Sequence, residues 1–254
     1  MASLVAVLHA RRGPRELVLV RHGESVGNIA DTEARDADAD RLELSARDAD
    51  VELSPNGEEQ GRTHGRWVAG LDEAARPDLV VSSPYRRAAD TARAALGELG
   101  GDVLLDERLR ERDLGLFDGL TGKGIRARYP EEAERRSHVG KFYYQPPSGE
   151  SWADVVLRVR SLLADLREGY DDRRVWLFTH QAVIMSFRYA LEGLDEAELL
   201  EIDRTTRISN ASVTRYIRDD DGLALQEFAD DSHLSSGPVA KTSEPDSADE
   251  APDA

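Results

Sequence analysis

The chain has 254 residues, of which 40% are hydrophobic, and it carries no cysteine and a formal net charge of −17. This length suffices for one sizeable α/β domain, and the missing cysteine excludes a disulfide framework and fits a cytoplasmic protein. The negative charge argues against a nucleic-acid partner, because a phosphate backbone needs a basic surface, and no apolar stretch is long enough to predict a membrane span.

Residues 1–14 are predicted to be an extension that precedes the folded domain. The pair Arg11 and Arg12 follows the apolar residues of this segment instead of preceding them, so we do not expect a signal peptide.

The first strand is predicted over residues 17–20, Leu-Val-Leu-Val, and it runs directly into Arg-His-Gly-Glu-Ser at residues 21–25. Ligands of open α/β sheets bind at the carboxyl edge of the strands, which is where this segment lies. An imidazole beside a guanidinium group is suited to attack phosphorus, since the neighbouring charge disfavours its protonation. His22 is therefore the candidate nucleophile.

Residues 31–50 form a polar stretch with eight acids and three arginines, which we interpret as an exposed and partly helical excursion. Together with residues 229–254, it supplies −11 of the net charge. A phosphate pocket in this chain would have to be a local basic island.

The remaining pattern alternates helices and strands. Helices are predicted over residues 55–69, 85–99, 123–129, 150–168 and 182–192, with Ser54 as a helix cap and Pro130 as a helix stop. Strands are predicted over residues 79–83, 103–105 and 174–179, followed by a hairpin of residues 212–218 and 223–228. This alternation predicts an α/β fold with a doubly wound, mostly parallel sheet and an antiparallel terminal hairpin.

Three further motifs follow in order: Ser-Ser-Pro-Tyr-Arg-Arg-Ala at residues 82–88, Leu-Arg-Glu-Arg-Asp-Leu-Gly at 109–115, and Thr-His-Gln-Ala at 179–182. With the Arg-His-Gly segment they resemble the histidine phosphatase superfamily, also called the phosphoglycerate mutase-like family, over about residues 17–216. The resemblance implies a three-layer α/β/α architecture.

The resemblance also implies the catalytic roles. His22 would form a phosphohistidine that water hydrolyses, Arg21 and Arg87 would clamp the phosphate, and His180 would hydrogen-bond it. Arg87 is chosen over Arg86 because the family pattern places the clamp directly before the alanine. Glu111 would protonate the leaving oxygen and then activate water.

Four further residues are candidate substrate contacts: Asn28, Arg112, Gln181 and Arg158. Asn28 has an equally good interpretation as an ordinary helix-start residue, and Arg112 and Arg158 have one at least as good as solvent-facing side chains. Gln181 stands where the family often has glycine.

The domain itself is predicted over residues 15–228. From residue 229 the chain is rich in Ser, Pro, Asp and Glu, so residues 229–254 are predicted to be a disordered acidic tail whose removal leaves fold and turnover intact. The four histidines without a motif are expected at the surface: His9, His64, His138 and His233.

The function favoured is a metal-independent phosphomonoesterase acting on a small phosphorylated metabolite. Cofactor-dependent mutases of the family carry a longer insert than residues 112–149, so a mutase is the first alternative, and a non-catalytic binding protein of the same fold is the second. No His-Glu-x-x-His or other metal spacing occurs, and we expect no metal or cofactor. The oligomeric state is left open.

Overall fold

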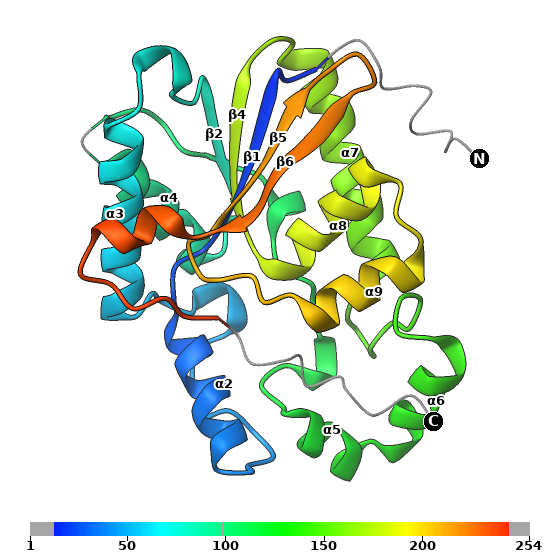
Figure 1. Cartoon of the computed structure of the whole chain (residues 1–254). Coiled ribbons are helices and arrows are strands. Elements are labelled where there is room, and N and C mark those ends of the chain that lie inside the picture. Colours follow the sequence, from blue (N-terminus) through cyan, green and yellow to red (C-terminus); the bar gives the residue numbers. More distant parts are fainter. Residues whose placement is uncertain (1–12, 98, 244–254) are drawn as a thin grey trace.

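The computed structural model describes residues 13–97 and 99–243 (Figure 1). Its centre is a six-stranded sheet in the order β3-β2-β4-β1-β5-β6. The strands are β1 (Glu16–Arg21), β2 (Leu79–Ser82), β3 (Leu104–Leu105), β4 (Arg174–Thr179), β5 (Val213–Arg218) and β6 (Leu223–Asp230). The first four strands pair in parallel, whereas β5 is antiparallel to β1 and to β6. The predicted mostly parallel sheet with an antiparallel hairpin is confirmed.

Helices cover both faces of this sheet (Figure 1). They are α2 (Val26–Asp36), α3 (Pro55–Ala69), α4 (Arg86–Leu96), α5 (Gly122–Arg128), α6 (Pro130–Val139), α7 (Trp152–Gly169), α8 (Gln181–Glu192) and α9 (Glu196–Thr205). The helices α3 and α4 lie on one face and α7 and α8 on the other, while α2, α5 and α6 lie beyond the carboxyl edge of the parallel strands.

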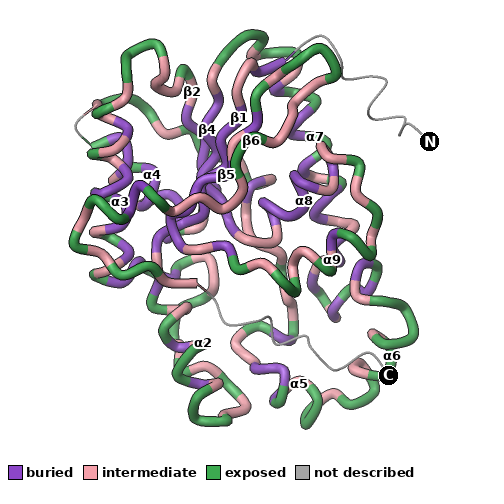
Figure 2. Tube along the Cα trace, viewed as in Figure 1, coloured by how far each residue is buried: buried purple, intermediate pink, exposed green. Residues whose placement is uncertain are grey.

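The central strand β1 explains the three layers. Leu17 and Leu19 pack in one apolar cluster with α7 and α8, whereas Val18 and Val20 pack in a second cluster with α3 and α4. Successive side chains of a strand point to opposite faces, so a continuous apolar run requires cover on both sides. Figure 2 shows β1 buried along most of its length.

The capping signals in the sequence place the helix starts. The side chain of Ser54 accepts from the Gly57 amide and Pro55 is the first residue of α3, as predicted. Ser151 and Asp154 form a capping box that starts α7.

Three helical expectations need correction. Pro130 ends α5, as expected, but it also begins α6, because the first helical turn needs no amide hydrogen from that position. The helix predicted over residues 85–99 ends already at Leu96. The helix α9 was missed, although Asp195 and Glu198 form a capping box at its start.

The acidic stretch of residues 31–50 is partly helical, as predicted, with α2 extending to Asp36 and a 3₁₀ turn over Asp48–Asp50. It also packs on another segment: the amide of Leu42 donates to the Gly119 carbonyl (3.0 Å), and that of Thr121 to the Asp40 carbonyl (3.1 Å). This stretch and the segment after Glu111 thus form one structural unit.

The expectation of a disordered tail from residue 229 is wrong as far as residue 243. The strand β6 continues to Asp230, and a 3₁₀ helix, Ser232–Ser236, then packs on α3 with His233 and Leu234 buried. Residues 244–254 lie outside the described residues. The Ser- and Asp-rich composition suggested disorder, because local composition does not indicate the contacts that these residues make with distant parts of the fold.

Two of the histidines expected at the surface are buried. His64 is fully buried in α3, and its Nδ1 lies 3.1 Å from Nε2 of His233. His138 is exposed as expected, and His9 lies outside the described residues.

Candidate active site

The register of the sheet brings the predicted motifs to one edge. Arg21 pairs with Thr179 across β1 and β4, so His22 and His180 follow side by side, with ring centroids 5.1 Å apart. The amide of Ser83, after β2, donates to the Phe178 carbonyl (2.9 Å), which brings the third strand end to the same place. Segments far apart in sequence therefore meet at the carboxyl edge, where α/β proteins bind ligands.

The tautomer of His22 follows from its contact. Its Nδ1 lies 2.7 Å from the carbonyl oxygen of Gly23, and a carbonyl can only accept, so Nδ1 carries the proton and donates. In the neutral ring, Nε2 then keeps the lone pair. Because His22 is 2% exposed, this lone pair is shielded from bulk water.

The electrostatics keep His22 neutral. Burial, then the charges of Arg87 and Arg21, lower the pKa of His22 well below the ordinary histidine value of 6.5. The imidazole is therefore neutral at neutral pH.

His180 is fully buried at the end of β4. Its Nε2 lies 2.9 Å from the Ser83 hydroxyl, while Nδ1 has no hydrogen-bond partner among residues 13–97 and 99–243. Burial and then Arg87 lower the pKa of His180 well below its usual value. Tyr85 stands edge-on to the ring at 5.4 Å.

The two predicted clamp arginines are both buried, with Arg21 fully so and Arg87 5% exposed. Arg21 donates to the Ile208 carbonyl. Arg87 donates to the Asp48 carbonyl (2.6 Å), and its guanidinium lies 2.9 Å from the Asp48 carboxylate. Arg86, by contrast, is exposed and pairs with Glu52, so the choice between the two arginines agrees with their placement.

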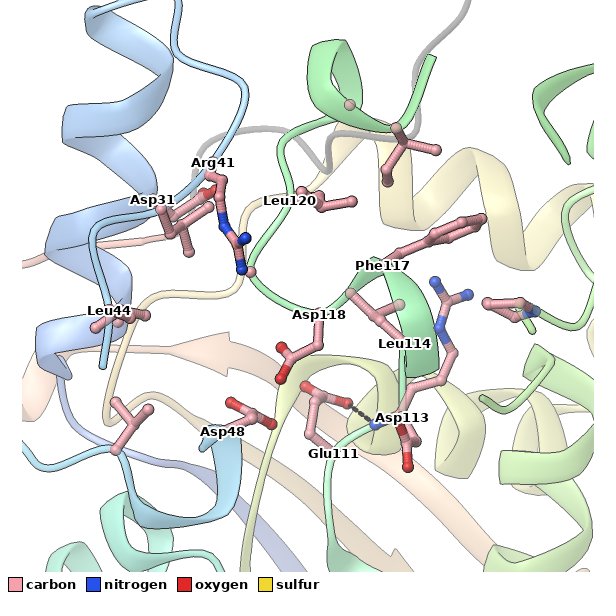
Figure 3. A pocket seen from close by; sticks show the side chains of 18 of the residues that line it. Asp31, Arg41, Leu44, Asp48, Glu111, Asp113, Leu114, Phe117, Asp118 and Leu120 are labelled. Atoms are coloured by element: carbon pink, nitrogen blue, oxygen red, sulfur yellow. Dashed lines mark hydrogen bonds between the residues drawn. The ribbon is translucent and has the colours of Figure 1, made fainter. Parts of the chain in front are cut away.

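A cavity of about 570 Å³ opens beside these groups. Glu111, Arg87 and Asn28 are among its lining residues, whereas His22 and His180 are not among them. The Glu111 carboxylate accepts from the amide of Arg112 at 2.7 Å (Figure 3) and from that of Ala182 at 3.5 Å. Glu111 is thus held at the cavity wall by backbone donors.

The predicted substrate contacts divide into two groups. Asn28 and Arg112 line the cavity, and the Arg112 guanidinium lies over the Trp152 ring at 5.5 Å. The side-chain oxygen of Asn28 also accepts from the Ser25 backbone amide (2.9 Å) in a capping box, so this residue helps to start α2 as well as lining the cavity.

Arg158 and Gln181 are not among the lining residues. Arg158 donates to the Arg108 carbonyl (2.6 Å) and the Glu111 carbonyl (3.2 Å), which makes it a support behind the site. Gln181 points toward α9, where its amide donates to Asp203 (3.4 Å). Their role as substrate contacts stays a prediction.

The cavity is locally basic in an acidic protein. Eight basic and six acidic residues line it, which agrees with the basic island that the net charge demanded. Three of the acids, Asp48, Glu111 and Asp118, lie near one another, whereas Asp31 lies apart, beside Arg41 (Figure 3). Burial and then the Asp48 carboxylate raise the pKa of Asp118. In the part of the chain that the structure describes, no group of three or more metal-ligating side chains is placed to hold a metal ion.

Three residues of the site were missed from the sequence. Ser83 contacts His180, Asp48 contacts Arg87, and the Asn210 amide donates to the His22 carbonyl (3.3 Å). Ser83 is the last residue of a predicted strand, so its position carried a signal. Asp48 and Asn210 carried none, because their contacts join segments 39 and 188 residues apart.

The fold is α/β, and two imidazoles and two guanidinium groups are buried together at the carboxyl edge of its sheet. The chain belongs to the histidine phosphatase superfamily (branch 1), whose family model matches residues 17–231. The predicted resemblance and the phosphoglycerate mutase-like fold are confirmed.

Two relatives illustrate the range of this family. The chain is 36% identical over 192 residues to the glucosyl-3-phosphoglycerate phosphatase of Mycobacterium tuberculosis, an alignment that covers 72% of this chain and 78% of that protein. It is 32% identical over 201 residues to the 2,3-bisphosphoglycerate-dependent phosphoglycerate mutase of Rhizobium etli, covering 75% and 86%.

The chain spans only 46% of the length of a bifunctional Mycobacterium tuberculosis protein to which it is 33% identical over 205 residues. Among solved structures, a mycobacterial glucosyl-3-phosphoglycerate phosphatase in complex with VO3 superposes with a TM-score of 0.66 at 31% identity, covering 85% of this chain and 98% of that one. In the described residues, no helix is long and apolar enough to cross a membrane.

Proposed function

We propose that this protein is a hydrolase of its family, a metal-independent phosphomonoesterase that works through a phosphohistidine at His22. The observation that carries this proposal is the arrangement of His22, with Nδ1 tied to the Gly23 carbonyl and two buried arginines near the ring. A neutral, desolvated imidazole with Nε2 unprotonated is the form that attacks phosphorus.

The reaction has two balanced steps. In the first, Nε2 of His22 forms a bond to phosphorus as the ester P–O bond breaks, and Glu111 gives its proton to the leaving oxygen. In the second, the Glu111 carboxylate takes a proton from water, whose oxygen bonds to phosphorus as the N–P bond breaks. Phosphate leaves, and His22 and Glu111 return to their starting states.

The remaining groups stabilise the transferred phosphoryl group. Arg21 and Arg87 supply positive charge for its equatorial oxygens. His180 has a buried Nδ1 without a hydrogen-bond partner among the described residues, and a phosphate oxygen would satisfy it. The His180 imidazole would therefore donate a hydrogen bond to the phosphoryl group in the transition state.

The substrate proposed is a small phosphorylated metabolite whose organic part enters the cavity. Arg112, Arg136 and Lys141 line that cavity and suit a second anionic group, such as a carboxylate. The relatives named for glucosyl-3-phosphoglycerate and phosphoglycerate make phosphorylated hydroxy acids the first compounds to test.

A phosphoglycerate mutase-type phosphotransferase is the second candidate, favoured by the Rhizobium etli relative. A mutase shares the phosphohistidine but returns the phosphoryl group to a bound acceptor in place of water. The ratio of phosphate release to phosphoglycerate interconversion separates the two.

The test is phosphate release in EDTA from glucosyl-3-phosphoglycerate, 3-phosphoglycerate, phosphoserine and sugar phosphates, with His22→Ala alongside. We expect release by the wild type and none by the variant. Faster interconversion of phosphoglycerates than hydrolysis would favour the mutase. No reaction in either assay would leave the non-catalytic binding protein.

A further inference from the structure

Two buried amide side chains connect the loop that carries His22 to the C-terminal part of the chain. Gln60 on α3 and Asn210 before β5 are both fully buried. Each contacts residues 21–28, which we call the His22 loop, with one end of its amide. Each contacts residues 237–243, which we call the C-terminal strap, with the other end.

The Gln60 contacts are complete at both ends. Its carbonyl oxygen accepts from the backbone amide of Glu24 in the His22 loop (2.8 Å). Its amide nitrogen donates to the Ala240 carbonyl (2.8 Å) and to the Thr242 hydroxyl (3.2 Å). The strap thus determines which way round this side chain faces the loop.

Asn210 makes the same kind of connection closer to the nucleophile. Its carbonyl oxygen accepts from the Thr242 hydroxyl (3.1 Å), and its backbone amide donates to the Thr242 carbonyl (2.7 Å). Its amide nitrogen donates to the His22 carbonyl (3.3 Å) and to the Asn28 side-chain oxygen (3.3 Å). Asn210 alone therefore links Thr242 to His22, although Thr242 lies 220 positions later in the chain.

The strap itself is anchored at several points. A Cβ on Gly237 would stand 2.5 Å from the Thr63 hydroxyl, so the chain passes close against α3 there. Ala240 exchanges two hydrogen bonds with the Asn56 side chain, at 3.1 and 3.2 Å, and Ser243 pairs with Ser209 as an isolated antiparallel bridge. This anchoring lets the strap act as a fixed reference for the loop.

Loss of the strap would leave buried polar groups unpaired. The Gln60 nitrogen would lose both strap acceptors, and the Asn210 oxygen would lose the Thr242 hydroxyl. Unpaired buried amide groups are costly, so both side chains would turn toward other partners and release the His22 loop. Misplacement of a reacting group by about 1 Å can lower a rate by about a hundredfold.

We propose that the C-terminal strap, acting through Thr242, Asn210 and Gln60, positions the His22 loop for phosphoryl transfer. This inference rests on the proposed function, in which His22 attacks phosphorus. Thr242 is a positioning residue under this proposal, because it contacts neither substrate nor the reacting atoms.

Thr242→Val tests the proposal, since it keeps the shape and removes the hydroxyl that holds both amides. Thr242→Ser restores the hydroxyl, and Thr205→Val is the matched control at an exposed threonine of α9. Chains that end after Pro238 or after Ser243 make the same comparison by truncation, because only the first lacks Ala240 and Thr242.

We expect Thr242→Val and the chain that ends after Pro238 to lower kcat by about tenfold with a change in KM below about twofold. Inhibition by orthovanadate, which mimics the five-coordinate transition state, should weaken by the same factor, while inhibition by inorganic phosphate should not. Thr242→Ser, Thr205→Val and the chain that ends after Ser243 should behave as wild type.

Three results would overturn the proposal: an unchanged kcat in Thr242→Val, a loss of kcat explained by the unfolded fraction in circular dichroism, or an equal loss in Thr205→Val. A wild-type chain that releases no phosphate would refute the proposed function instead. In that case, the NMR signals of the His22 ring in Thr242→Val decide: a shift from wild type supports the strap, and unchanged signals refute it.

Discussion

At the scale of single residues, His22 combines a fixed tautomer with a depressed pKa. The Gly23 carbonyl holds the proton on Nδ1, and burial with two nearby guanidinium groups disfavours a second proton. Both effects leave the same atom, Nε2, unprotonated.

Replacing Arg87 by Met should raise the pKa of His22, because the change removes a positive charge while keeping the ring buried. His22 would then protonate at a higher pH than in the wild type. NMR titration of the ring measures this midpoint. Arg86→Met is the matched control at the exposed neighbour, and an equal midpoint in Arg87→Met and wild type would contradict the account.

Asp48 forms an ion pair with the Arg87 guanidinium, which in the proposed function binds the substrate phosphate. Asp48→Asn keeps the backbone contact and removes the competing charge, so inorganic phosphate should inhibit at a several-fold lower concentration. Asp50→Asn, which removes a carboxylate paired with Arg47, is the control and should leave inhibition unchanged. Weaker inhibition in Asp48→Asn would mean that the carboxylate instead holds Arg87 in place.

The sequence predicted the residues that follow strands and missed those that reach the site from elsewhere. His22, Arg87 and His180 lie within three motifs that follow strands β1, β2 and β4, and parallel strands bring their carboxyl ends together. Asp48 belongs to a stretch that seemed only exposed and acidic. The roles of all these residues in catalysis stay predictions.

At the scale of elements, the start of α3 packs backbone to backbone against the His22 loop. A Cβ on Gly57 would stand 1.9 Å from the Glu24 carbonyl oxygen, and one on Gly23 would stand 2.6 Å from the Gly57 carbonyl oxygen. Only glycine allows this approach, which lets α3 hold the loop directly.

Gly57→Ala should therefore destabilise the protein by roughly 1–3 kcal/mol, since overpacking outweighs the gain of up to about 1 kcal/mol in helix propensity. Gly169→Ala is the matched control, because a Cβ at this helical position meets nothing within 4 Å. Urea unfolding measures both. A Gly57→Ala variant as stable as wild type would show that the loop yields easily.

Most elements could be predicted from local patterns, and the exceptions have a common cause. The caps of α3 and α7 and the apolar runs of β1 and β4 act over a few residues, so the sequence displays them. The packing of residues 229–243 on α3 depends on partners such as Asn56 and Gln60, which lie about 180 positions earlier. Local composition contains no signal for such a contact.

At the scale of the whole molecule, four histidines among residues 13–97 and 99–243 are buried with a lowered pKa: His22, His64, His180 and His233. The unfolded chain binds protons at these sites near the ordinary value of 6.5, whereas the folded chain resists them. These histidines therefore do not reduce the free energy of unfolding above this value, and they reduce it increasingly as the pH decreases below about 6.5.

His64→Gln should reduce the loss of stability on acidification, because it removes one buried imidazole with a lowered pKa. The thermal unfolding midpoint measured at pH 7.5 and 5.5 gives the slope. His138→Gln, at the exposed histidine, should keep the wild-type slope. An unchanged slope in His64→Gln would mean that the pair of His64 and His233 does not take part.

If the phosphoryl group passes through His22, the phosphorylated enzyme can be trapped. The protein is mixed with p-nitrophenyl phosphate and quenched in alkali, which preserves phosphohistidine, and the peptides are analysed by mass spectrometry. We expect a phosphorylated peptide with the modification on His22, and no such peptide from His22→Ala. Hydrolysis by the wild type with no modification of His22 in any rapid quench, or hydrolysis by His22→Ala at the wild-type rate, would contradict it.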